Sequence, residues 1–177
     1  MPSKKIATIG MMIAIAFVLN YIEVLIPINV GIPGVKLGMS NIVVVFCLYT
    51  LGPVMAFAIA IIRIILCGLT FGSISSMIYS LAGGMLSYVI MLLMKKINRF
   101  SIYGVSVVGG VSHNLGQILM AMLVLQTKLL IYYYPFLIVT GVAAGFFVGM
   151  LSASTAFSRD IKDLPLSYNI LYIFCKS

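Results

Sequence analysis

Three strongly polar side chains fall within five residues of an otherwise apolar segment, in the sequence HNLGQ at positions 113–117. His113 and Gln117 are four residues apart, so a helix would place them on one face, with Asn114 on the flank of that face. Such a group can line a cavity and hydrogen-bond a ligand. It can equally join two helices inside a membrane, where each bond contributes about 0.6 kcal/mol. The sequence leaves both interpretations open.

Two charged residues lie in apolar segments of their own. Arg63 stands in the middle of AFAIAIIRIILCG, and Glu23 lies near the end of the first apolar run. A charge at the centre of a bilayer costs about 2.5–3.5 kcal/mol on insertion scales, so it needs a partner or a wet cavity. Glu23 and Arg63 could form an ion pair that fastens two helices, or one or both could contact a ligand. These two interpretations are compatible.

The acidic residues are too few for enzymatic chemistry on diphosphates. The chain has three, Glu23, Asp160 and Asp163, whereas prenyl transfer needs a carboxylate cluster that holds Mg²⁺ against the phosphates. The sequence has no Walker A pattern for ATP, and its single His without neighbouring ligands does not indicate a metal. We therefore predict no catalytic residue, no metal site and no cofactor.

These polar residues belong to a chain of 177 residues that is 63% hydrophobic and 8% charged. Soluble domains are about 45–50% apolar and about 25% charged, so this chain cannot cover a soluble surface. The predicted fold class is an all-α membrane protein, with one integral membrane domain over residues 1–177. The net charge of +8 is then expected to sort by membrane side, and no nucleic-acid partner is expected.

Apolar runs divided by Gly, Pro and charged residues predict six transmembrane helices, over 6–26, 40–51, 54–69, 74–94, 103–125 and 129–157, with a cytoplasmic tail at 158–177. The region 40–69 allows one kinked helix or two spans divided at Gly52-Pro53. Two spans place the basic cluster at 95–99 on the same side as the N-terminal lysines. The positive-inside rule favours this topology, with both termini cytoplasmic.

In this topology the polar side chains of the spans, Asn20 and Ser80 among them, lie between the outer surface and the midplane. They predict a pocket that opens outward, which the loop PINVGIPGVKLG (27–38) could cover. Lys36 in that loop is either a solvated lysine or a contact for an anionic group. The residues expected to bind a substrate are Glu23, Lys36, Asn41, Arg63, Tyr79, His113, Asn114 and Gln117.

Small residues recur at a spacing of four on two of the expected helices. Gly141, Gly145, Gly149 and Ala153 form a stripe on the last helix, and Gly10 and Ala14 form a shorter one on the first. Stripes of this kind let helices approach closely. The longer stripe predicts internal packing, whereas the Gly10/Ala14 face could meet either a neighbouring helix or another protein.

Five segments of the chain resemble a bacterial membrane family labelled heptaprenyl diphosphate synthase component I, and also Gx transporter. They are YIEVLIP (21–27), PGVKLGMSNIVVV (33–45), LYTLGP (48–53), SLAGGMLS (80–87) and GVSHNLGQ (110–117). The family is similar to the S components of energy-coupling factor (ECF) transporters. The resemblance implies a six-helix bundle in the bacterial cytoplasmic membrane and a pocket for a vitamin-like, flavin-related or isoprenoid-related solute. It also implies that Gly10 and Ala14 dock a transmembrane coupling protein that works with ATPase subunits.

Two functions of different classes follow. The first is a solute-binding subunit of an ECF-type uptake transporter, which predicts a solute-sized cavity near His113. The alternative is a membrane accessory subunit of a heptaprenyl diphosphate or electron-transfer system without its own catalysis. That alternative predicts that the polar side chains satisfy one another.

Overall fold

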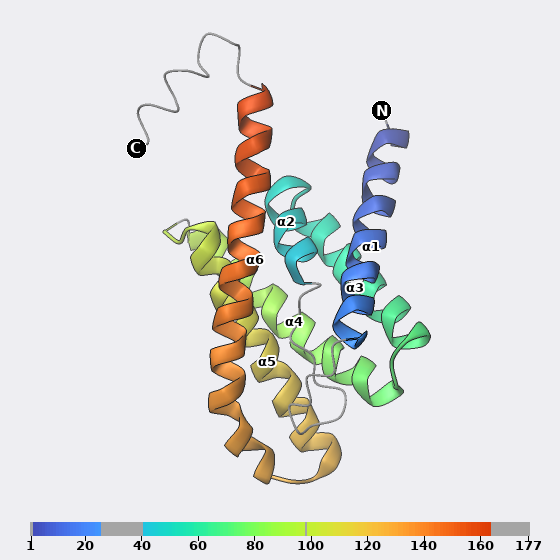
Figure 1. Cartoon of the computed structure of the whole chain (residues 1–177), viewed down its shortest axis with the longest axis vertical. Helices are drawn as coiled ribbons and strands as arrows, with labels where there is room; N and C mark the ends of the chain where they lie inside the picture. Colours follow the sequence, from blue (N-terminus) through green and yellow to red (C-terminus); the bar gives the residue numbers. More distant parts are fainter. Residues whose placement is uncertain (1, 26–40, 98, 164–177) are drawn as a thin grey trace.

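The computed structural model describes residues 2–25, 41–97 and 99–163, with side chains over 6–25, 41–97 and 99–150, and this part of the chain contains helices and no strand (Figure 1). The all-α class predicted from the sequence is confirmed. The elements are α1 (Pro2–Leu25), α2 (Asn41–Thr50), α3 (Pro53–Thr70), α4 (Ile74–Ile97), α5 (Ile102–Leu125), the 3₁₀ helix η1 (Leu129–Tyr133) and α6 (Tyr134–Asp163).

Five segments within the described helices are long and apolar enough to cross a membrane: Ile6–Leu25, Pro53–Thr70, Ile74–Ile97, Ile102–Leu125 and Leu129–Met150. The chain is therefore a membrane protein with several candidate spans. Helix α2 has ten residues and measures about 15 Å at 1.5 Å per residue. Because the hydrocarbon core is about 30 Å thick, α2 can cross only part of it.

The chain divides into two helices at Gly52-Pro53 instead of continuing as one kinked helix. Gly52 has a φ of 91°, in the left-handed region that residues with a Cβ rarely adopt. Pro53 is the first residue of α3, where its missing N–H removes no helical hydrogen bond. Together the two residues end one helix and start the next, and Pro53 adds no unpaired N–H at the start of α3.

Helix α2 is enclosed by its neighbours. Six of its ten residues are buried, and it packs against α1, α3 and α6. The last carbonyls of a helix have no partner within it, and at this end Lys95 of α4 donates a hydrogen bond from Nζ to the Leu48 carbonyl. The Lys95 ammonium also lies 4.7 Å from the centre of the Tyr49 ring. A cation on α4 therefore caps the half-buried C-terminal end of this short helix.

Glycines bring α4, α5 and α6 into backbone contact. A Cβ added at Gly110 would lie 2.5 Å from the Gly141 carbonyl oxygen, and one at Gly145 would lie 2.6 Å from the Val107 Cα. Between α4 and α5, a Cβ at Gly116 would lie 2.8 Å from the Gly83 Cα. The small-residue stripe of α6 therefore packs inside the protein, as its spacing predicted.

The first residues of α1 and the last residues of α6 lie at the same end of the bundle (Figure 1). Helix α6 continues to Asp163, beyond position 157 where the apolar run predicted its end. Positions 26–40 and 164–177 lie outside the described residues. The predicted covering loop, its Lys36 and most of the predicted tail therefore fall there.

We expect Lys95→Met to lower the free energy of unfolding by about 1.5–3 kcal/mol, because the buried end of α2 loses a charged hydrogen-bond donor. Lys96→Met is the matched control, since Lys96 is the exposed neighbour on the same helix turn. Denaturant unfolding of the purified protein in detergent measures both. Equal losses in the two variants would contradict the capping role of Lys95.

Candidate functional site

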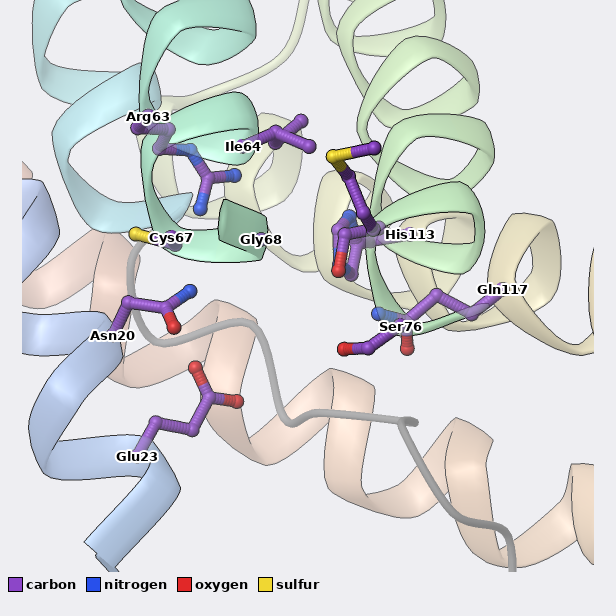
Figure 2. A pocket seen from close by; sticks show the side chains of 11 residues that line it. Asn20, Glu23, Arg63, Ile64, Cys67, Gly68, Ser76, His113 and Gln117 are labelled. Carbon is purple, nitrogen blue, oxygen red and sulfur yellow. The ribbon is translucent and has the colours of Figure 1, made fainter. Parts of the chain in front are cut away.

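A polar pocket lies among α1, α3, α4 and α5 (Figure 2). Its empty space is about 370 Å³, including the part that opens to the outside. Much of that space is open to the outside, so the enclosed part is small and suits ordered water or one compact group. Its polar lining consists of Asn20, Glu23, Arg63, Ser76, Ser80, His113 and Gln117.

Helical spacing explains why these side chains share one space. Asn20 and Glu23 are three residues apart on α1, while Ser76 and Ser80 on α4, like His113 and Gln117 on α5, are four apart. Residues at these spacings lie on one face of a helix. Each helix therefore contributes a polar pair or, in the case of α3, a single arginine.

Arg63 and Glu23 form the charged wall of the pocket. Arg63 is 3% exposed and Glu23 is 8% exposed. In Figure 2 the guanidinium from α3 and the carboxylate from α1 point into the same space, with the Asn20 amide beside them. The two groups are close enough for their charges to interact. Because the signs are opposite, the pair lowers the cost of placing either charge inside a membrane protein.

Gln117 forms the opposite wall and is completely buried. Within the described part of the chain, neither its amide oxygen nor its amide nitrogen has a hydrogen-bond partner. A Cβ added at Gly83 would lie 2.8 Å from Gln117 Cγ and 2.6 Å from the His113 carbonyl. The close approach of α4 therefore holds this amide in place. A buried polar group without a protein partner points to a ligand or an ordered water as its partner.

Asn114, the third polar residue of HNLGQ, lines neither this pocket nor the second one described below. Its Nδ2 donates a 2.8 Å hydrogen bond to the Leu137 carbonyl of α6, and Thr140 donates to the same oxygen from its own helix at 3.1 Å. The HNLGQ group therefore divides by role: His113 and Gln117 face the pocket, and Asn114 joins α5 to α6. The sequence left open whether this group lines a cavity or joins two helices. The first interpretation applies to His113 and Gln117, and the second applies to Asn114.

Asn41 and Tyr79 also lie outside the polar pocket. Asn41 Nδ2 donates to Ser87 Oγ at 3.3 Å, and Ser87 Oγ donates to the Gly109 carbonyl at 2.8 Å, which links α2, α4 and α5. Asn41 and His113 line a second, smaller pocket. Tyr79 packs in an apolar cluster that includes Ile118 and Leu137.

The structure thus brings together four of the eight residues expected to bind substrate: Glu23, Arg63, His113 and Gln117. Sequence reasoning did not single out Ser76 and Cys67, which also line the pocket. The available signal was their spacing, since Ser76 lies four residues before Ser80 and Cys67 four after Arg63. Among the described residues, no three His, Cys, Asp or Glu side chains gather in a way that could hold a metal ion.

Gly10 and Ala14 lie on an exposed face of α1. A Cβ added at Gly10 would meet no atom within 4 Å, and the neighbours of α1 are α2 and α3. This pair of small residues is therefore not used for packing within the described bundle.

The fold and the pocket define a helical membrane protein that encloses a small polar cavity among its helices. A family model described as heptaprenyl diphosphate synthase component I matches residues 12–155, and the chain belongs to this family. No curated protein and no solved structure matches the chain.

We expect the stability effects of Glu23→Gln and Arg63→Met to be coupled. Each single change leaves one buried charge without its counter-charge and lowers the free energy of unfolding by about 3–5 kcal/mol. The double variant is expected to recover part of that loss, with a coupling energy of about 0.5–3 kcal/mol. Unfolding of all four proteins in mixed micelles measures the coupling. Purely additive losses would show that the two charges do not act as a pair.

Proposed function

We propose that the protein is a membrane accessory component of a heptaprenyl diphosphate synthase system and has no catalytic centre of its own. The family description supports this role, because it names a component of such a synthase. The places of the acidic residues in the helices are the structural observation that carries it. Glu23 lies in the polar pocket beside Arg63, whereas Asp160 and Asp163 lie at the last turns of α6. Three acidic residues at such separate places in the chain do not supply the Mg²⁺-binding cluster that diphosphate chemistry needs.

The test is reconstitution with the catalytic prenyl diphosphate synthase encoded in the same genome. We expect the catalytic component to sediment with membranes, or to give more long-chain product, only when this protein is co-expressed. Immunoblotting of a tag on this protein in each membrane preparation controls for the amount inserted. A catalytic component that is equally active and equally soluble without this protein would refute the accessory role.

A second candidate function is favoured by the buried amide of Gln117, which lines the polar pocket and has no hydrogen-bond partner among the described residues. In this proposal the protein is the solute-binding subunit of an ECF-type uptake transporter in the bacterial cytoplasmic membrane. The uncovered Gly10/Ala14 face of α1 would then receive a helix of the transmembrane coupling protein, since small residues permit close helix contact.

For this second candidate, Gly10→Leu is expected to reduce co-purification of the coupling protein by about tenfold, a loss of about 1.4 kcal/mol. The added side chain would hold the partner helix away from α1. Ala143→Leu is the matched control, because Ala143 is also exposed on a spanning helix. Quantitative mass spectrometry of the tagged complex, expressed with coupling and ATPase subunits, gives the ratio. Equal recovery in both variants would remove Gly10 from the docking surface.

A further inference from the structure

We infer that the polar pocket binds a small, electrically neutral molecule that presents a hydrogen-bond donor next to an acceptor, as in a carboxamide, lactam or imide. This inference rests on the second proposed function, in which the pocket holds a ligand, and it names the class of that ligand. The observations that lead to it are the amide of Gln117, the charges of the lining and the size of the space.

The Gln117 amide specifies the hydrogen-bonding pattern. It offers one acceptor oxygen and one donor nitrogen side by side, and neither has a partner in the described part of the chain. In Figure 2 the side chain extends from α5 toward Ser76 and the interior of the pocket. The group that satisfies both atoms at once is a donor beside an acceptor, which is the edge of another amide. A ligand with only acceptors, such as a phosphate, would leave the oxygen of Gln117 unsatisfied.

The charged wall specifies the net charge of the ligand. The described lining contains one cation, Arg63, and one carboxylate, Glu23, and their charges interact. A diphosphate carries several negative charges, and here it would meet a single guanidinium that already has a neighbouring carboxylate. Like charges held together in a buried site are costly. The lining therefore favours a neutral molecule and disfavours the diphosphate group of an isoprenoid.

The remaining lining specifies shape and size. Ile64, Cys67 and Met77 contribute an apolar part of the wall next to the polar groups. Such a surface can pack against the face of a flat ring, and Met sulfur in particular contacts aromatic rings favourably. The space is small and partly open, which limits the ligand to a compact group at the mouth of the pocket and excludes a long isoprenoid chain.

The experiment is isothermal titration of the purified protein with three probes: uracil as an imide, nicotinamide as a carboxamide, and inorganic diphosphate as the anion. We expect uracil or nicotinamide to bind and diphosphate not to bind. Gln117→Leu should weaken that binding about tenfold or more, since it removes both hydrogen bonds. Ser112→Ala is the matched control, because Ser112 is buried on the same helix, lines neither pocket and donates to the Val108 carbonyl of its own helix.

The thermal midpoint of Gln117→Leu separates a binding role from a structural one. The substitution removes a buried amide that has no protein partner, so the midpoint is expected to stay the same or to rise. A fall of several degrees would show that the amide stabilises the fold, and would overturn the inference.

Native mass spectrometry of the protein as purified distinguishes the inference from the function on which it rests. Binding of diphosphate alone, or a co-purified anion, would overturn the neutral class and leave the solute-binding function standing. A co-purified neutral molecule that contains an amide or imide would support the class even if neither probe binds. No bound probe and no co-purified molecule would refute both.

Discussion

The low polarity of the bilayer is the constraint on which the rest of this structure depends. A polar group inside a membrane protein cannot rely on water, so it must find its partner within the protein or in a bound molecule. Three contacts meet this requirement within the protein. Lys95 caps the end of α2, Asn114 joins α5 to α6, and the charges of Glu23 and Arg63 offset each other. The amide of Gln117 finds no partner for either of its polar atoms among the described residues, and single buried atoms of Ser106, His113 and Asn114 also have none.

The polar residues fall into two groups, those that join helices and those that line the pocket. Asn41, Ser87 and Asn114 form hydrogen bonds between helices, and these bonds suit a protein whose polar groups serve assembly. His113, Gln117 and Arg63 instead line a pocket, which suits a protein that binds a small ligand. The family description points to a synthase component, and a non-catalytic partner subunit can have both properties. What the two proposed functions share is that the protein binds and docks, and leaves the chemistry or the energy supply to another subunit.

Close packing of α4 against α5 positions the side chains that form one wall of the pocket. Gly83 and Gly116 bring α4 and α5 so near that an added Cβ at either would meet backbone atoms. Because the helices lie so close, the pair Ser76 and Ser80 on α4 and the pair His113 and Gln117 on α5 line the same pocket. With larger residues at these positions the helices would separate by the width of a side chain. The amide of Gln117 would then face a wider gap.

The sequence by itself determined the class of the protein and its local structure. Composition required a membrane environment, the distribution of basic residues favoured two helices over 40–69, and the spacing of His113 and Gln117 placed them on one face. It also identified Glu23 and Arg63 as charges within apolar segments, where each needs a partner or a wet cavity. Only the tertiary structure decided which of these polar side chains meet. Asn114 is adjacent to His113 in sequence, yet it bonds to α6 while His113 lines the pocket. The physical reason is that spacing fixes a side chain's direction around its own helix, whereas its neighbour depends on how closely and in what order the helices pack.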